Sequence, residues 1–174
     1  MLIILILLHS YFGKKNSQLS AFIYLCRINT SPKGNTFTSI FKNNIGMAIA
    51  PLIIESSELT PEVVLDKDSN VFMFKGKSLP ENPLAFYKPI LNWIDEYALE
   101  PNAKTEVNFM MIYFNTSSSK VFLDIMKKLE AINRSGSKCC INWYYKDDDE
   151  EMLEAGEIYS ERVNLEFNLI VDEN

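Results

Sequence analysis

Short apolar segments separated by polar turns run through residues 52–171 and predict a series of β-strands. The first three are expected close together, before any helix, with the Asp/Asn/Ser-rich segment 66–70 as the turn between the second and the third. The segment 105–114 is apolar almost throughout after Asn108, which predicts a central strand covered on both faces. The predicted strands are 52–55, 62–66, 70–76, 105–114, 138–145 and 165–171.

Apolar positions that repeat every three or four residues predict three helices between these strands. Ser78 and Glu81 have the Ser-x-x-Glu spacing of a capping box, so the first helix is expected to start there. It is expected to cover residues 82–98, with Pro89 bending it. The third helix is very acidic and is expected over residues 147–162.

The second predicted helix follows Phe114 and has one apolar face. On its other face, Asp124 and Lys128 are four residues apart and are expected to form an ion pair. The Ser-Gly-Ser segment 135–137 is expected to end the helix. The residues expected to face the core are Phe122, Ile125, Met126, Leu129 and Ile132.

The predicted order is three strands followed by helix, strand, helix, strand, helix and strand. Strand–helix–strand crossovers place parallel strands side by side, so the order predicts an α/β domain with a layered, mixed β-sheet and crossover helices.

The charge divides the chain in two. Residues 1–46 hold five of the 17 Lys and Arg residues and none of the 23 Asp and Glu residues, a charge of +5. Residues 47–174 hold the other 12 basic and all 23 acidic residues, a charge of −11. We therefore expect the folded domain at residues 50–172, with residues 1–46 outside the fold as a disordered or mis-annotated extension.

The segment 1–46 has three interpretations. The leading one is a mis-assigned translation start, with Met47 as the true initiator. The apolar run 1–8 has the length of a signal-peptide core and is too short to span a bilayer, so a membrane anchor or degenerate signal is the second. An ordered extension is the third.

The cysteine and histidine content argues against a metal site or a disulfide framework. The three cysteines are Cys26, Cys139 and Cys140, there is no Cys-x-x-Cys, and His9 is the one histidine. This cysteine usage fits a cytoplasmic location. The charge of −11 argues against binding to a nucleic-acid backbone.

The segment Tyr113–Lys120 is the most informative for function. It reads Tyr-Phe-Asn-Thr-Ser-Ser-Ser-Lys and lies where a predicted strand ends and a predicted helix begins. The free N–H groups and positive dipole end of a helix favour an anion at such a junction. A helix cap formed by Asn115 or Thr116 explains one polar side chain there. The three serines that follow Thr116, together with Lys120, exceed what capping needs, so a bound or covalently attached phosphate is the functional interpretation.

Interpretations of the chain as an enzyme lack the further motifs that they require. The Ser-x-x-Lys pattern at residues 117–120 occurs without the Ser-Asp-Asn and Lys-Thr-Gly motifs of penicillin-recognising enzymes. The acidic run 147–151 lacks the alternating ligands and central glycine of an EF-hand loop. A solvated helix start explains that run, and an acidic docking surface formed by Asp147, Asp148, Asp149 and Glu150 is its functional alternative.

Taken together, residues 52–172 resemble the SiaC family of bacterial regulatory phosphoproteins. Leu79 departs mildly from the resemblance, since the family usually has an aromatic residue there. The matching segments, in chain order, are Thr60-Pro61-Glu62-Val63, Gly76-Lys77-Ser78-Leu79-Pro80-Glu81-Asn82, Phe86-Tyr87-Lys88-Pro89, Tyr113-Phe114-Asn115-Thr116-Ser117-Ser118, Trp143-Tyr144-Tyr145 and Asp147-Asp148-Asp149-Glu150-Glu151-Met152.

The resemblance implies a STAS-like α/β domain, similar to anti-sigma-factor antagonists, that acts as a non-enzymatic switch without a cofactor or metal. It implies a dedicated kinase that phosphorylates Thr116, with Ser117 as the alternative acceptor, and a PP2C-like phosphatase that removes the phosphate. Asn115, Ser118 and Lys120 would surround the site. The unphosphorylated form would bind a signalling target such as a diguanylate cyclase in a cytoplasmic partner-switching pathway, without membrane contact. The alternative is an α/β domain that binds a small anionic ligand and is never phosphorylated.

Overall fold

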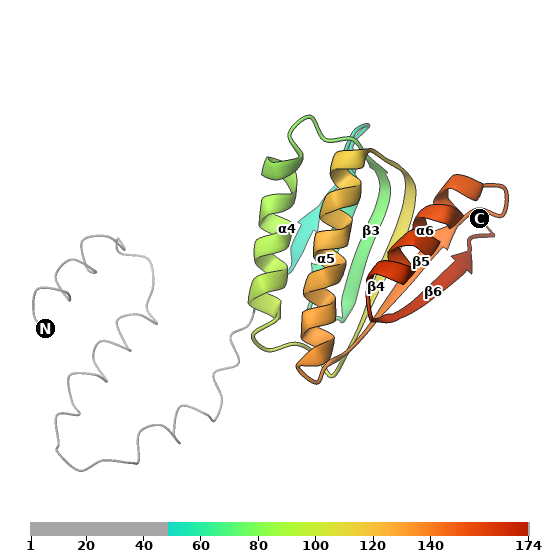
Figure 1. Cartoon of the computed structure of the whole chain (residues 1–174). Helices are drawn as coiled ribbons and strands as arrows, with labels where there is room; N and C mark the ends of the chain where they lie inside the picture. The colour runs from blue at the N-terminus through green and yellow to red at the C-terminus, as the bar shows by residue number, and fades with distance from the viewer. Residues whose placement is uncertain (1–48, 174) are drawn as a thin grey trace, which may run out of the picture. The chain divides into compact units, whose positions relative to one another are not determined.

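The computed structural model describes residues 49–173, which form a six-stranded mixed sheet with three helices (Figure 1). The predicted extension 1–46 lies outside these residues. The strands are β1 (Leu52–Ile54), β2 (Glu62–Asp66), β3 (Val71–Ser78), β4 (Lys104–Phe114), β5 (Lys138–Tyr145) and β6 (Glu166–Val171). The helices are α4 (Pro83–Tyr97), α5 (Thr116–Arg134) and α6 (Glu150–Arg162).

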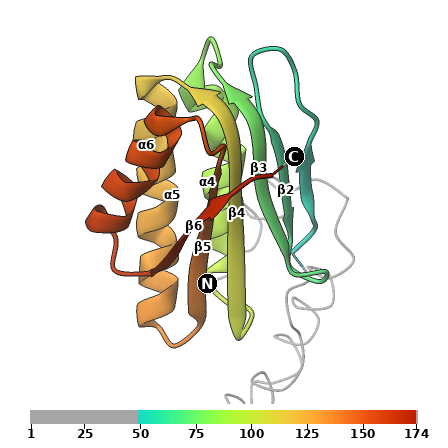
Figure 2. The same cartoon turned by 90° about the vertical axis from the view of Figure 1, so that its right-hand side faces the viewer.

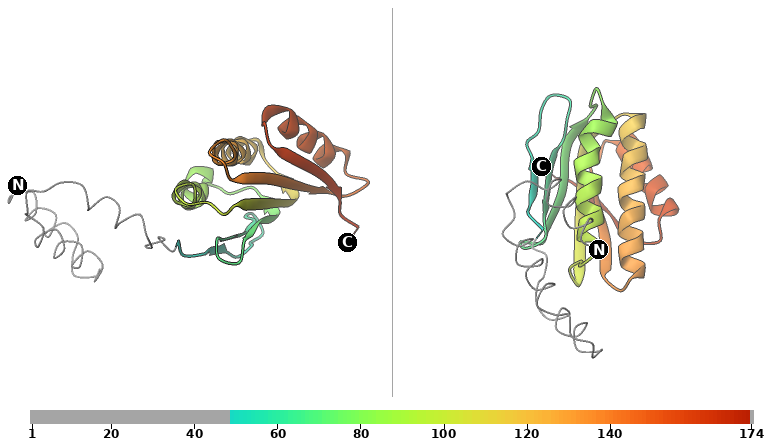
Figure 3. Two further views of the ribbon diagram at one scale, coloured as in Figure 1. Left: turned by 90° about the horizontal axis from the view of Figure 1, so that it is seen from below. Right: turned by 90° about the vertical axis from the view of Figure 1, so that its left-hand side faces the viewer.

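The strands lie in the sheet in the order in which they occur in the chain. β1, β2 and β3 form an antiparallel meander, and β3, β4, β5 and β6 run parallel to one another. Each parallel connection moves one strand in the same direction, and right-handed crossovers therefore place all the connecting helices on one face. Figures 2 and 3 show α4, α5 and α6 on one side of the sheet. The predicted mixed α/β architecture is confirmed.

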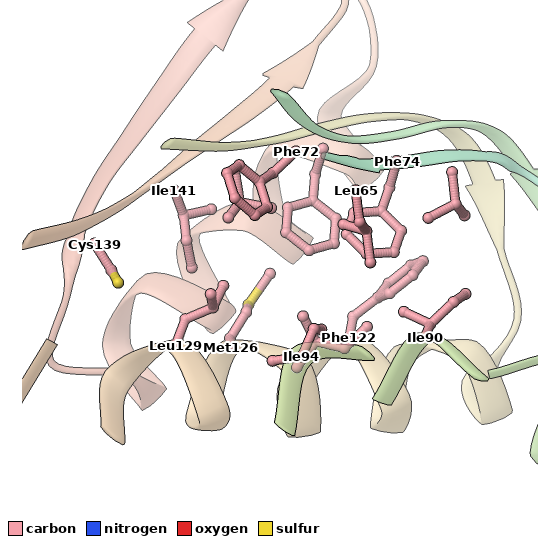
Figure 4. Packing of buried hydrophobic residues seen from close by; sticks show 14 of the residues in the cluster. Leu65, Phe72, Phe74, Ile90, Ile94, Phe122, Met126, Leu129, Cys139 and Ile141 are labelled. Carbon is pink, nitrogen blue, oxygen red and sulfur yellow. The ribbon is translucent and has the colours of Figure 1, made fainter. Parts of the chain in front are cut away.

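The hydrophobic core lies between that face and the helices (Figure 4). Phe74 and Phe109 stack at a centroid distance of 4.8 Å, and Phe122 of α5 meets both rings edge-on. The five residues predicted for the apolar face of α5 are all buried. Fully burying a side chain of this size contributes about 2 kcal/mol, so the helix layer is held mainly by this interface.

Within the described part of the chain, no helix covers the opposite face of the sheet, which corrects the prediction for the central strand. Side chains of β4 alternate between buried positions and positions that are half-buried or exposed. Asn108 lies on the open face and is hydrogen-bonded by Asn142, which is hydrogen-bonded by Asn168 in turn, at 3.0 Å each. The apolar run of the central strand predicted that both of its faces are covered. One face instead carries a ladder of hydrogen-bonded asparagines across β4, β5 and β6.

The first helix begins later than the capping-box prediction. Ser78 is the last residue of β3 and is fully buried, so it does not cap a helix. Asn82 is the N-cap, and its side chain accepts from the backbone N–H of Ala85 at 3.1 Å. Pro89 does lie inside α4. The Ser-x-x-Glu spacing was misleading because Ser78 belongs to the sheet.

The predicted Asp124–Lys128 ion pair is wrong. Lys128 pairs with Asp95 of α4, so this lysine links α4 and α5. α6 begins at Glu150, three residues after the prediction, with Asp149 as its N-cap. Gly136 has φ +113 after α5, in agreement with the predicted end of that helix.

Candidate functional site

Asn115 caps the N-terminus of α5 and leaves Thr116 as the first residue of the helix. The side-chain oxygen of Asn115 accepts from the backbone N–H of Ser118 at 2.8 Å, and its carbonyl accepts from the N–H of Ser119 at 2.9 Å. The N–H of Asn115 donates to the carbonyl of Ser78 at 3.1 Å, which holds the cap against the end of β3. Thr116 is therefore not used as a cap and its hydroxyl is available for another role.

Ser118 is sequestered beneath the first turn of α5. It is fully buried, and its Oγ donates to the carbonyl oxygen of Ser78 at 3.0 Å. Ser78 Oγ donates to Ser118 Oγ at 2.7 Å, so the hydroxyl of Tyr87 must be the donor in its 2.5 Å contact with Ser78 Oγ. Burial raises the pKa of Tyr87 to about 12, and the tyrosine stays a neutral donor. This network ties α4, β3 and α5 together.

The hydroxyl of Ser119 is also hydrogen-bonded. Tyr159 of α6 donates from its hydroxyl to Ser119 Oγ at 2.8 Å and lies 3.1 Å from the carbonyl oxygen of Ser119. Burial raises the pKa of Tyr159. The start of α5 is thus fixed from one side by Tyr87 and from the other by Tyr159.

Thr116 and Ser117 are the exposed hydroxyls of the segment 116–119. They occupy the first two positions of α5, whose N–H groups have no helical acceptor, whereas the N–H groups of Ser118 and Ser119 bind Asn115. An anion on either hydroxyl would meet free donors and the positive end of the helix dipole. Burial and hydrogen bonding therefore leave two of the four hydroxyls, those of Thr116 and Ser117, available to carry an anion.

Lys120 is exposed and lies four residues after Thr116 and three after Ser117. Both spacings put its side chain on the same surface of the helix as the hydroxyl, so it can screen a charge on either. The first turn of α5 contains no acidic residue. The local charge thus favours an added anion but does not choose between the two acceptors.

The predicted acidic docking residues lie at the same end of the sheet, because α5 and α6 both begin at carboxyl ends of adjacent parallel strands (Figure 1). Asp147 and Asp148 are exposed in the turn after β5. Asp149 caps α6 by accepting from the N–H of Met152 at 2.9 Å, and Glu150 is in its first turn. Asp149 therefore has a structural role beside any role in docking.

The supporting residues Ser78, Tyr87 and Tyr159 were not predicted as part of the site. Ser78 was assigned to a capping box, and the two tyrosines to helices without a specific role. No local pattern links them to Ser118 and Ser119, which lie 40 residues from Ser78 and 40 from Tyr159. A buried hydroxyl with a distant partner leaves no periodic signal in the sequence.

Within residues 49–173, no group of three or more His, Cys, Asp or Glu side chains is arranged to hold a metal ion. None of the helices in this part of the chain combines the length and the apolar character needed to span a membrane.

Comparison with known proteins assigns the folded domain to one family. Residues 54–172 match the SiaC family of regulatory phosphoproteins. An uncharacterized protein of Pseudomonas aeruginosa is 25% identical over 119 residues, which are 68% of this chain and 94% of that protein.

Solved structures agree. Apo-SiaC from Pseudomonas aeruginosa matches with a TM-score of 0.64 and 25% identity over 70% of this chain and 98% of that one. SiaC in its complex with the diguanylate cyclase SiaD, which it activates, matches with a TM-score of 0.65 and 24% identity over 70% of this chain and 99% of that one. Because the family match covers more than half of the sequence and nearly all of the folded domain, the chain belongs to the SiaC family of regulatory phosphoproteins.

Proposed function

We propose that this protein is a phosphorylation-controlled switch that binds and activates a diguanylate cyclase when Thr116 is unphosphorylated. A cognate kinase adds the phosphate, and a PP2C-like phosphatase removes it. The domain itself performs no chemical step in this scheme. Its part is to present one surface in two charge states to its target in a partner-switching pathway.

The exposure of the hydroxyls at the start of α5 is the observation that carries the proposal. Ser118 is buried and Ser119 is bonded to Tyr159, whereas Thr116 and Ser117 are exposed. A kinase can reach an exposed hydroxyl at a helix start without unfolding the domain. We assign the phosphate to Thr116 because it corresponds to the threonine of the Asn-Thr-Ser-Ser motif that the family resemblance brings to residues 115–118.

The switch would act through the position of the phosphate charge at the start of α5. A phosphate adds −1.5 to −2 charges at pH 7, and the free N–H groups and dipole at the start of α5 accommodate them. A target packed over the junction would have to remove water from this dianion, which is very costly without a pairing cation. Phosphorylation would therefore abolish binding while the fold stays intact.

Two apolar side chains beside the phosphorylation site supply a surface for the target. Ile112 is 63% exposed and Tyr113 is 50% exposed, directly before the strand ends. The pairing of β3 with β4 shifts register between Gly76 and Lys77, where Gly76 has φ +104, and Ile112 is left without a partner on β3. Large apolar side chains held outward beside a modifiable hydroxyl favour protein contact. A diguanylate cyclase is the proposed target because SiaC of Pseudomonas aeruginosa activates one in a solved complex.

The acceptor is identified by mass spectrometry of the protein from its own host, with Thr116→Val and Ser117→Ala as matched variants. We expect phosphate on wild type and Ser117→Ala and none on Thr116→Val. Phosphate retained by Thr116→Val would move the acceptor to Ser117. Absence of phosphate in all three, together with a rise in melting temperature on adding inorganic phosphate, would favour the alternative of a passive anion-binding domain.

The switch is tested with a diguanylate cyclase purified from the same organism. Unphosphorylated protein should form a complex and raise cyclase activity, whereas protein phosphorylated at Thr116 should bind at least tenfold more weakly. Thr116→Val should bind as the unphosphorylated form does. Equal binding by the phosphorylated and unphosphorylated proteins would rule the switch out.

A further inference from the structure

Among residues 49–173, β6 is an edge strand that pairs with β5 alone, on the side of the sheet opposite the three-residue β1. It has six residues, Glu-Phe-Asn-Leu-Ile-Val, without the proline, lysine or bulge that commonly protects an edge. Leu169 and Val171 are 37% and 40% exposed. An unprotected edge of this length can accept a further strand.

The direction of its backbone groups follows from one hydrogen bond. The N–H of Asp172 donates to the carbonyl of Tyr145 on β5 at 2.7 Å. Along a parallel strand, successive residues direct their N–H and C=O groups to opposite sides. Asn168 and Ile170 therefore bond toward β5, whereas Phe167, Leu169 and Val171 direct theirs away from the sheet. The edge offers three donors and three acceptors to an added strand.

The asparagine ladder of the open face ends at the same edge with an acceptor. Asn168 Nδ2 donates to Asn142 Oδ1, Asn142 Nδ2 donates to Asn108 Oδ1, and Asn108 Nδ2 donates to the carbonyl of Phe72. All donors thus point inward along the sheet. Asn168 is exposed, and none of the hydrogen bonds of the ladder uses its Oδ1 as an acceptor.

The flank above this edge is strongly acidic. Gly156 of α6 faces Trp143 and Leu169 of the sheet, and Tyr159 faces α5. By helical periodicity, the stripe of α6 opposite Tyr159 faces away from α5. Helix α6 itself lies over the β5–β6 side of the sheet (Figure 3). That stripe consists of four exposed glutamates at successive turns, Glu150, Glu154, Glu157 and Glu161.

Nearly all the net charge of the folded domain lies in this region. Residues 147–173 contain eleven Asp and Glu residues and Arg162 as their one basic residue, a charge of −10. Residues 49–146 contain the other 12 acidic residues and 11 basic ones, a charge of −1. Pairing β6 with the β6 of a second copy would bring two acidic α6 flanks together, so self-association at this edge is opposed.

We propose that the β6 edge, flanked by the acidic helix α6, is a docking site for an extended basic segment of another protein. The segment adds as a seventh strand next to β6, its backbone bonds Phe167, Leu169 and Val171, and its Lys and Arg side chains face the glutamates. Backbone pairing supplies affinity and charge supplies selection. This site is separate from the start of α5 and does not depend on phosphorylation.

The test uses the full chain and a synthetic peptide, acetyl-Lys-Val-Thr-Val-Lys-Val-Thr-Lys-amide, followed by amide NMR and hydrogen exchange. We expect the peptide to protect the amides of Phe167, Leu169 and Val171, which otherwise exchange freely, while Asn168 and Ile170 are already protected. A peptide of the same length with Glu in place of Lys should not bind.

Two variants separate backbone pairing from charge. Val171→Pro removes an outward N–H and no bond to β5, so affinity should fall about tenfold relative to Val171→Ala, which keeps the N–H. The triple change Glu154→Gln, Glu157→Gln and Glu161→Gln should weaken binding about tenfold at low salt, and much less at 0.5 M salt because of screening.

The remaining outcomes contradict the proposal. Peptide-induced shifts at β1, or no shifts, would overturn it. Equal binding by Val171→Pro and Val171→Ala would show adsorption to α6 without strand addition. Protection of the three outward amides without peptide that increases with protein concentration, together with a dimer in sedimentation, would make a second copy the occupant.

Discussion

Helices α5 and α6 begin at the same end of the sheet, after adjacent parallel strands. Each helix is capped by a side chain that accepts a hydrogen bond from the backbone N–H three residues further on. At α6 the cap is Asp149 and the first turn holds Glu150 and Glu151, so fixed carboxylates complement the helix dipole. At α5 the cap is the neutral Asn115, and the first turn contains hydroxyls and no acid.

Under the proposed switch, the difference is between a permanent charge at α6 and a removable one at α5. An anion added at α6 would meet carboxylates, whereas an anion added at α5 would meet an uncompensated helix end. A regulator controlled by phosphate benefits from a helix start that is left neutral.

The first prediction contrasts a buried and an exposed hydroxyl in the same turn of α5. Ser118→Asp places a carboxyl group inside the network of Ser78 and Tyr87, and should lower the free energy of unfolding by about 3 kcal/mol or more. Ser117→Asp, at an exposed position near the dipole, should change it by less than about 0.5 kcal/mol. Urea unfolding followed by circular dichroism measures both. Equal destabilisation would show that the network does not anchor the helix start.

The second prediction concerns Tyr87 beneath the start of α5. Its pKa is raised from the ordinary 10.0 to about 12 by burial, so the unfolded chain loses the proton at lower pH than the folded one. Its contribution is fully present below pH 10 and is lost as pH rises through 12. Two pKa units correspond to about 2.7 kcal/mol.

Unfolding measured between pH 9 and pH 12 in wild type and Tyr87→Phe isolates this effect from the other tyrosines. The phenylalanine variant should lose less stability over that interval, although it is less stable at neutral pH because Ser78 loses a hydrogen bond. Parallel pH curves for the two proteins would contradict the assignment.

The third prediction tests how α6 is seated on the sheet. A Cβ at Gly156 would lie 2.6 Å from Leu169 Cδ2 and 2.6 Å from Trp143 Cδ1. Gly156→Ala should lower the free energy of unfolding by about 1–2 kcal/mol, since overpacking costs more than the gain in helix propensity of about 1 kcal/mol. Glu154→Ala, on the exposed side of the same helix, is the control. A stabilised Gly156→Ala protein would mean that α6 moves freely on the sheet.

The fourth prediction exchanges the two caps. Asn115→Asp gives α5 a fixed charge and should stabilise the protein by a few tenths of a kcal/mol, whereas Asp149→Asn should destabilise it by a similar amount. Both differences should shrink at 0.5 M salt. Thermal unfolding at low and high salt provides the measurement. Asn115→Asp should also slow phosphorylation at Thr116, and an unchanged rate would show that local charge is unimportant there.

The sequence was sufficient for the order of elements because that order depends on local periodicity. β2 and β5 have their predicted bounds, and the apolar face of α5 is buried as predicted. Ser78 was misassigned because its spacing to Glu81 fits a helix start, whereas its burial depends on Tyr87 and Ser118. Lys128 was paired with the wrong acid because Asp95 is 33 residues away in the sequence.

The sequence pointed to the candidate site, and the structure shows which of its hydroxyls are exposed. A hydroxyl run between an apolar strand and an amphipathic helix indicates an anion-friendly junction without any long-range information. Which hydroxyls are available depends on Tyr87 and Tyr159, which reach Ser78 and Ser119 from other helices. The open face of the sheet was not predicted, because an apolar strand has the same sequence pattern whether one or both of its faces are covered.

Trp143 connects the two regions that distinguish this protein. Its indole N–H donates to the carbonyl of Met152 on α6 at 2.9 Å, and its ring lies 5.9 Å from that of Phe114, two residues before Thr116. The sequence has one other tryptophan, Trp93. A Trp93→Phe protein would therefore carry a single tryptophan between the proposed phosphorylation site and the acidic edge. Its emission, excited selectively over that of the tyrosines, could follow both the addition of phosphate and the binding of a partner without a label.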